Sequence, residues 1–165
     1  MKDADFTAYV RKIFPGASPA TVSYITNTIY PPPGSAALPY KTDLDRAALI
    51  TSDVVLTCNT YLLALAYQNN TYNYLFNIPP ALHGGDLHYT FGPDSSTTSD
   101  QIRLAIQDYV TSFVLKGNPN RAGQPDFPMY GSANQVLDLA PRAIEPKPDP
   151  AASDRCLMLQ KKVWT

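Results

Sequence analysis

The chain contains two histidines, His83 and His88, and their surroundings differ. His83 follows an aromatic-rich segment and precedes Gly84 and Gly85, which allow close backbone approach. Imidazole exchanges protons near neutral pH because its unperturbed pKa is about 6.5. His83 is therefore our candidate general base, and a loop histidine bonded to the backbone is the alternative. We expect no direct chemical role for His88.

A metal site is not expected. His83, Asp86 and His88 lie close together in the sequence, but a local group without a fourth ligand is weak evidence for a metal. The chain has no CxxC, no HExxH and no acidic calcium loop. P-loop and dinucleotide-binding patterns are also absent from the sequence, so we expect no cofactor.

The sequence lacks a recognisable serine nucleophile. The G-x-S-x-G elbow of serine hydrolases exposes its serine on a tight turn between a strand and a helix. Gly34-Ser35 and Gly131-Ser132 lack the second flanking glycine and a following helical pattern. A histidine base is thus present without the group that it would activate.

The elements that must position these residues can be predicted from periodicity and capping signals. Apolar spacing of three and four residues predicts helices, and alternation predicts strands. We expect helices over 6–13, 19–29, 42–67 with a break at 51–53, 98–117 and 154–164, and strands over 72–77 and 135–139. Ser18 is the expected cap of the second helix, with Pro19 at its first position. The helix over 98–117 is expected to begin at a capping box from Thr98 and to end at Gly117, and its apolar face is formed by Ile102, Ala105, Ile106, Tyr109, Val110, Phe113 and Val114. Proline clusters at 31–33, 79–80 and 146–150 are predicted to be connections, because proline lacks an N–H donor.

The composition limits the classes of partner. Hydrophobic residues make up 44% of the 165 residues, charged residues make up 16%, and the net charge is -1. Nucleic-acid binding and electrostatic membrane attachment both require concentrated Lys and Arg, so neither is expected. The polar start of the chain is unlike a signal peptide, and we predict no transmembrane segment.

Two features suit a secreted protein. Cys58 and Cys156 are an even pair, which forms either a disulfide or two buried thiols. Asn69-Asn70-Thr71 is a sequon that would accept a glycan at Asn69.

One segment is similar to a known family. The sequence YLFNIPPALHGGDLHYTFG over 74–92 resembles the histidine loop of fungal type-B carboxylesterases and related lipases, in which a strand leads into an H-G-x-D/E loop. Further segments match the family in the same order, at 58–60, 105–120, 127–131, 136–139, 155–156 and 160–161. The resemblance covers most of the chain, and the histidine loop is its most specific part.

The resemblance implies a fold and a role for one residue. It implies an α/β class, with residues 1–165 as one incomplete, C-terminal portion of an α/β-hydrolase domain that is rich in helices and has a few strands. His83 matches the general base of the family's triad. The family's serine, oxyanion glycines and acid lie upstream of this region, and Asp3 and Asp5 do not match the acid motif.

The family activity is hydrolysis of carboxylic esters, with small-molecule or lipid esters as substrates and secretion as the usual location. We expect residues 1–165 to be inactive alone, and to associate with a chain that supplies the missing sheet. The alternative is a non-catalytic binding protein derived from the esterase fold.

Overall fold

The computed structural model describes residues 2–35, 38–93 and 99–161. The chain forms two compact units. Unit 1 comprises residues 1–66 and 150–165, and unit 2 comprises residues 67–149.

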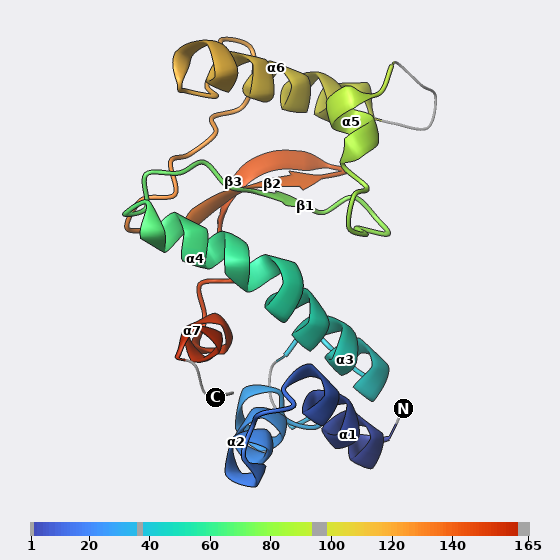
Figure 1. The fold of residues 1–165 in the computed structure, drawn as a ribbon. Helices are drawn as coiled ribbons and strands as arrows, with labels where there is room; N and C mark the ends of the chain where they lie inside the picture. Colours follow the sequence, from blue (N-terminus) through green and yellow to red (C-terminus); the bar gives the residue numbers. More distant parts are fainter. Residues whose placement is uncertain (1, 36–37, 94–98, 162–165) are drawn as a thin grey trace. The chain divides into compact units, whose positions relative to one another are not determined.

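Unit 1 is helical (Figure 1). Its elements are α1 (Asp3–Ile13), α2 (Pro19–Tyr24), the π-helical segment η1 (Ile25–Ile29), α3 (Asp43–Ser52), the π-helical segment η2 (Asp53–Thr57), α4 (Cys58–Ala66) and α7 (Asp154–Gln160). The Ser18 side chain accepts a hydrogen bond from Thr21 N and Pro19 begins α2, which confirms the predicted cap. A disulfide between Cys58 and Cys156 joins α4 to α7.

The predicted break at 51–53 is wrong. The chain stays helical from α3 through η2 into α4, with the wider π turn at Asp53–Thr57. Thr51 stays in the helix, and its hydroxyl donates to the Ala47 carbonyl four residues earlier (2.7 Å), a bond that is compatible with helical geometry. The stop signal in the sequence therefore marks a change of helical pitch.

A buried arginine organises the first helices of unit 1. The Arg46 side chain has no exposed surface and pairs with Asp3 (2.6 Å) and Asp43 (2.8 Å). It also donates to two backbone carbonyls, one of them that of Tyr30 (2.9 Å). Its guanidinium lies 3.7 Å from the centre of the Phe6 ring. These contacts compensate for the loss of water around a buried charge.

By length and composition alone, one helical stretch of unit 1 could cross a membrane. It runs from Asp43 to Ala66, has a mean hydropathy of 1.5, and is weak evidence for a span. The stretch carries Arg46 and Asp53, both of which are buried within the protein and paired with opposite charges. Of the most apolar window of this stretch, 28% is buried within the protein.

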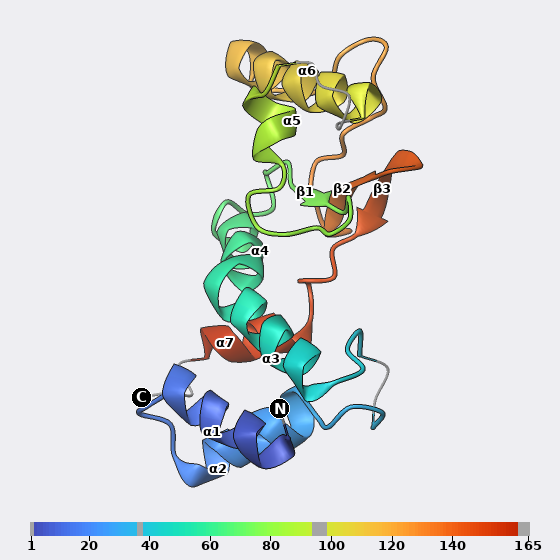
Figure 2. The same ribbon diagram turned by 90° about the vertical axis from the view of Figure 1, so that its right-hand side faces the viewer.

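Unit 2 places two helices on one side of a small mixed sheet (Figures 1 and 2). The strands are β1 (Tyr74–Phe76), β2 (Gln135–Ala140) and β3 (Ala143–Pro148), and the helices are α5 (Leu87–Phe91) and α6 (Asp100–Lys116). β1 pairs with β2 in parallel, and β2 pairs with β3 antiparallel. Among the described residues, the second edge of β1 has no partner strand.

The core of unit 2 lies between its helices and its sheet. It consists of Tyr89 from α5, four residues of α6, Phe127, and Leu137, Leu139 and Ile144 from the sheet. The α6 residues are Ile102, Ala105, Ile106 and Tyr109. They recur at helical spacing, as predicted.

The prediction for the outer half of α6 is wrong. Val110, Phe113 and Val114 were expected on the buried face, but their side chains are 43%, 50% and 76% exposed. The apolar positions of α6 extend around the helix, and the sheet covers only one stripe of them. The predicted stop at Gly117 is confirmed, since this residue has a φ of 70° and its N–H bonds to the Phe113 carbonyl. Thr98 of the expected capping box lies outside the described residues.

The strand β3 was not predicted. Pro146 and Pro148 were interpreted as parts of a connection, yet both lie in this strand. β3 is an edge strand, where a residue without an N–H donor is tolerated.

Candidate functional site

The candidate site is the turn that carries His83, directly after β1. Two tight turns connect the strand to α5. In the first, the Ala81 N–H bonds to the Ile78 carbonyl (2.7 Å) across a cis peptide between Pro79 and Pro80. This is the arrangement of a type VI turn. It redirects the chain immediately before His83.

The second turn presents the histidine. The Gly85 N–H bonds to the Leu82 carbonyl (2.9 Å), so His83 and Gly84 are its two central residues. Gly84 has a φ of +77°, the left-handed region that the third position of a type II turn requires. This geometry favours glycine at position 84.

Gly85 is needed for a different reason. A Cβ built there would lie 3.0 Å from the Leu82 carbonyl oxygen and 3.2 Å from an edge carbon of Phe76. The turn therefore packs directly on a side chain of β1. The two glycines that follow His83 have separate structural roles, one conformational and one steric.

A hydrogen bond also ties the turn to the strand. The Tyr74 hydroxyl of β1 donates to Asp86 Oδ2 at 2.5 Å. Desolvation by partial burial, and then the neighbouring Asp86 carboxylate, raise the pKa of Tyr74. Tyr74 therefore stays protonated over the physiological range and remains the donor of this bond.

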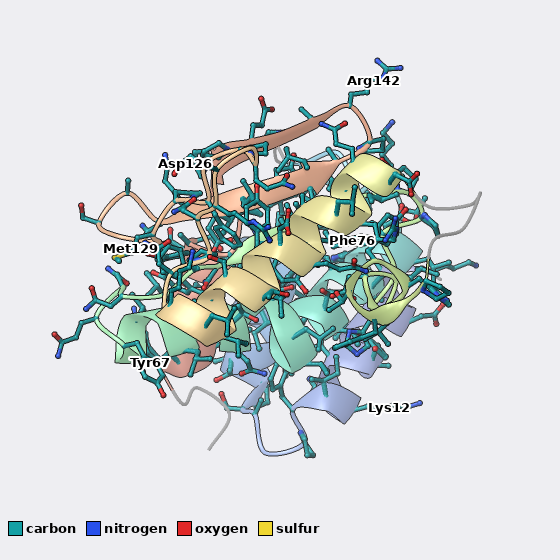
Figure 3. The ribbon with its side chains drawn as sticks, turned by 90° about the horizontal axis from the view of Figure 1, so that it is seen from above. Lys12, Tyr67, Phe76, Asp126, Met129 and Arg142 are labelled. Carbon is teal, nitrogen blue, oxygen red and sulfur yellow. A yellow bond between two sulfur atoms is a disulfide. The ribbon has the colours of Figure 1, made fainter. Side chains whose placement is uncertain are left out.

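The helices of unit 2 hold the other end of the loop. The rings of Phe76 and Tyr89 meet edge to face at 5.3 Å between centroids, and Figure 3 shows Phe76 beside α5. The Gln107 amide of α6 donates to the carbonyls of Tyr89 (3.1 Å) and Gly92 (3.3 Å). The segment is thus fixed on β1, α5 and α6.

The His83 side chain is exposed. Within the described part of the chain, its imidazole forms no hydrogen bond or ion pair. His88 lies in α5 and is also exposed. The turn therefore presents the His83 ring to solvent, with both ring nitrogens open to a partner.

The sequence cluster of His83, Asp86 and His88 is not brought together as a metal-binding group. Among the described residues, the atoms of a candidate ligand group that converge within 4.8 Å belong to Asp53, Cys58 and Cys156. The two cysteines are joined in the disulfide, so their sulfurs are not available as thiolate ligands.

Two polar contacts were not predicted from the sequence. One is the bond between Tyr74 and Asp86, although alternation places Tyr74 and Phe76 on one face of β1. The other is a buried cluster in unit 1, where Asp53 accepts from Tyr30 (2.8 Å) and Arg155 (2.9 Å). Arg155 is 102 residues from Asp53, and no local pattern relates them.

The fold and the site now define a class. A strand that pairs in parallel, a tight turn with an exposed histidine and a helix against the sheet are consistent with part of an α/β-hydrolase fold. A model of the carboxylesterase family matches residues 25–152. The chain belongs to the carboxylesterase family.

Curated relatives agree with this assignment. Carboxylesterase patB of Aspergillus clavatus and carboxylesterase patB of Penicillium expansum are each 32% identical to this chain over 162 residues. The alignments cover 96% of this chain and 29% of each relative. Secreted lipase 4 of Gibberella zeae is 26% identical over 180 residues, which cover 94% of this chain and 32% of that protein. The chain thus spans less than a third of the length of these relatives.

A solved structure is also similar. It is an esterase from anaerobic Clostridium hathewayi that can hydrolyse aliphatic aromatic polyesters. The match has a TM-score of 0.44 and 20% sequence identity, and it covers 98% of this chain and 30% of that one.

Proposed function

We propose that this chain supplies the general base, His83, of a carboxylic ester hydrolase that works through a serine triad. The observation that carries the proposal is the position of His83. It lies in a glycine-dependent turn directly after a parallel strand, and ligands of open α/β sheets bind outside the carboxyl ends of such strands. Membership of the carboxylesterase family supports the same reaction class.

The proposed chemistry uses both nitrogens of the imidazole. One nitrogen takes the proton of a serine hydroxyl as that oxygen attacks the ester carbonyl carbon, and then returns the proton to the leaving alcohol. The other donates its N–H to a carboxylate that fixes the tautomer. In the second half of the cycle, the histidine takes a proton from water as the water attacks the acyl-enzyme. It then returns the proton to the serine oxygen, and the carboxylic acid product is released.

The serine, the oxyanion donors and the acid must come from polypeptide outside residues 1–165. No G-x-S-x-G elbow occurs in this sequence, and His83 has no carboxylate partner within the described part of the chain. Loss of one triad member costs on the order of 10⁴–10⁶-fold in serine hydrolases. We therefore propose that residues 1–165 alone are inactive.

The first test measures residues 1–165 alone with a short-chain p-nitrophenyl ester. The native chain should hydrolyse it no faster than the His83→Ala variant. A native rate well above that of the variant would contradict the proposed dependence on outside residues.

A chimera tests the role of His83 itself. Residues 1–165 replace the matching 29% of the Aspergillus clavatus relative, which contributes the remainder of the family domain. We expect ester hydrolysis, a loss on the order of 10⁴-fold for His83→Ala, and little change for His88→Ala as the matched control. A folded chimera in which His83→Ala keeps full activity would refute the proposal. A folded chimera without any activity would favour a non-catalytic binding protein derived from this fold.

We also propose that both units belong to one carboxylesterase domain. The family match spans residues 25–152 and so includes part of unit 1 and all of unit 2. The free edge of β1 supports association with polypeptide that extends the sheet, because Tyr74 and Leu75 remain 43% and 38% exposed there. Sedimentation of residues 1–165 should show association, and a sharp monomer with cooperative melting would contradict it.

We also propose that the protein is secreted and that Asn69 carries a glycan. One relative is named a secreted lipase, and the chain carries the sequon Asn69-Asn70-Thr71. Asn69 lies in the turn that begins unit 2, just after α4. Expression through a eukaryotic secretory pathway should give a product whose mass falls on treatment with an amidase that removes N-glycans. The Asn69→Gln variant should show no such change.

The substrate class follows from the same family. Small-molecule or lipid esters are proposed substrates, and the reaction requires neither a metal nor an organic cofactor. The rate at which the chimera hydrolyses p-nitrophenyl esters with acyl groups from acetate to palmitate would distinguish small-molecule esters from lipid esters as substrates.

A further inference from the structure

Two exposed leucines lie next to the proposed general base in unit 2. Leu82 directly precedes His83 in the chain and is 67% exposed. Leu87, the first residue of α5, is 55% exposed. Its Cδ1 atom lies 3.6 Å from the point that a Cβ on Gly84 would occupy. One exposed leucine thus adjoins His83 itself, and the other lies against the residue that follows it.

The backbone of Leu82 is fixed, although the residue is mostly exposed. Its carbonyl accepts the Gly85 N–H (2.9 Å), which closes the turn that carries His83. The preceding residue, Ala81, has a φ of +53°, in the left-handed region that is unfavourable for a residue with a Cβ. Such conformations are concentrated at active sites and at segments that hold ligands. The backbone at Ala81 and the exposure of Leu82 are independent observations, and both favour a segment that contacts a ligand.

The proposed chemistry of His83 determines which part of an ester lies beside Leu82. The imidazole returns a proton to the oxygen of the leaving alcohol, and that oxygen must then lie about 2.6–3.2 Å from a ring nitrogen. The carbonyl oxygen of the acyl part is bound instead by the oxyanion donors. Since consecutive Cα atoms are only about 3.8 Å apart, a group attached to the alcohol oxygen is within reach of the Leu82 side chain.

The side chains of this segment indicate which alcohols fit. Leu82 and Leu87 offer alkyl surface, and contact with an alkyl group removes apolar area from water. Asp86 is the acidic residue of the segment, and its Oδ2 atom already accepts the Tyr74 hydroxyl (2.5 Å). An uncharged alcohol with an alkyl body therefore complements this surface better than a cationic alcohol does.

We propose that Leu82 is a specificity-determining residue for ester hydrolysis and selects esters whose alcohol part is apolar and uncharged. The inference rests on the function proposed for His83 and adds the part of the substrate that this end of the turn recognises. Leu87 supplies further alkyl surface beside Gly84.

Three acetate esters test the proposal in the chimera of residues 1–165 with the remainder of the Aspergillus clavatus relative. 3,3-Dimethylbutyl acetate and acetylcholine have alcohol groups of nearly the same shape, one uncharged and one cationic, and ethyl acetate has a short alcohol group. Release of acetic acid, titrated at constant pH, gives kcat/KM for each ester. A ratio of two substrates in one preparation does not depend on the fraction of folded enzyme.

Two substitutions at position 82 test the residue. Leu82→Ala should lower the ratio of kcat/KM for 3,3-dimethylbutyl acetate over ethyl acetate about fivefold, because the larger alcohol loses an alkyl contact. Leu82→Asp should shift the ratio between 3,3-dimethylbutyl acetate and acetylcholine about tenfold towards acetylcholine, because it places a carboxylate beside the alcohol. Leu104→Ala in α6 is the matched control and should change neither ratio, since Leu104 is 50% exposed but lies outside the histidine turn.

The outcomes separate the role of Leu82 from that of His83. Unchanged ratios in both Leu82 variants, in a chimera whose activity depends on His83, would overturn the inference and leave the general base in place. Equal changes in Leu104→Ala would also overturn it, because the effect would not be local to the turn. A folded chimera that hydrolyses none of the three esters would contradict the proposed function, and the role of Leu82 with it.

Discussion

The Tyr74 hydroxyl and the Asp86 carboxylate lie 2.5 Å apart and join β1 to the turn that presents His83. The bond closes a loop of only twelve residues along the chain, and that loop contains both tight turns. A strand residue therefore controls the position of a turn residue, through a side chain that the family motif alone does not single out.

Replacing Tyr74 by Phe should loosen the histidine turn. The lost bond to a carboxylate stabilises by about 1 kcal/mol at a partly exposed site, so the free energy of unfolding should fall by that amount. Faster hydrogen exchange at the Gly85 N–H would locate the effect in the turn. Tyr67→Phe is the matched control, since Tyr67 is 62% exposed and points outward in Figure 3. Equal exchange at Gly85 in both variants would contradict the role given to Tyr74.

Replacing Gly84 by Ala should strain the same turn through the backbone. A φ of +77° costs an L-residue with a Cβ about 1 kcal/mol, although no neighbouring atom clashes with that Cβ. Gly123→Ala is the control, because Gly123 has a φ of +90° and open space around it. Both variants should lower the melting temperature, but only Gly84→Ala should shift the His83 ring signals in NMR spectra. Unchanged His83 signals in Gly84→Ala would argue against this account.

Reduction of the disulfide should destabilise unit 1. Cys58 and Cys156 are 98 residues apart, and closure of a loop of that length restricts the unfolded chain by about 4 kcal/mol. The variant with both cysteines changed to Ser should melt at a lower temperature than the oxidised native chain, and a reductant should lower only the native value. Mass spectrometry of alkylated samples, before and after reduction, checks the bond itself. A melting temperature that does not respond to reduction would contradict the prediction.

Stability should fall at high pH because of buried tyrosines. Burial, followed by the charges of Asp126 and Asp108, raises the pKa of Tyr109 to about 12. The folded state thus holds this proton more tightly than the unfolded state does. The resulting stabilisation is complete below the unfolded pKa of about 10, and it is lost as the pH rises through 12.

The Tyr109→Phe variant tests whether stability falls in this direction with pH. It removes a hydrogen bond to the Pro125 carbonyl (2.7 Å) and should be less stable by about 1 kcal/mol at neutral pH. The difference from the native chain should shrink as the pH rises from 10 to 12, measured by urea unfolding. A difference that is constant over this range would show that Tyr109 titrates normally.

Local signals accounted for several parts of the fold. The Ser18 cap, the start of α2 at Pro19 and the Gly117 stop of α6 depend on neighbouring residues, so the sequence determines them. The family resemblance around His83 is equally local, since its residues are nearly contiguous. The family match over residues 25–152 agrees with that interpretation.

Other parts depended on partners far along the chain. β3 formed despite two prolines because β2 lies beside it, and the outer face of α6 stayed exposed because the sheet covers one stripe only. The predicted strand over 72–77 shortened to Tyr74–Phe76, the three residues that pair with β2. Backbone pairing sets the limits of a strand, and the partner is invisible to local periodicity.

The sequence by itself determined a chain with helix caps, two glycines after His83 and the residue types of a carboxylesterase histidine loop. Only the tertiary structure decided that Tyr74 holds this loop and that Arg155 meets Asp53 across 102 residues. The physical reason is that caps and turns are satisfied within a few residues. The pairing of buried polar groups depends instead on which distant segments pack against them.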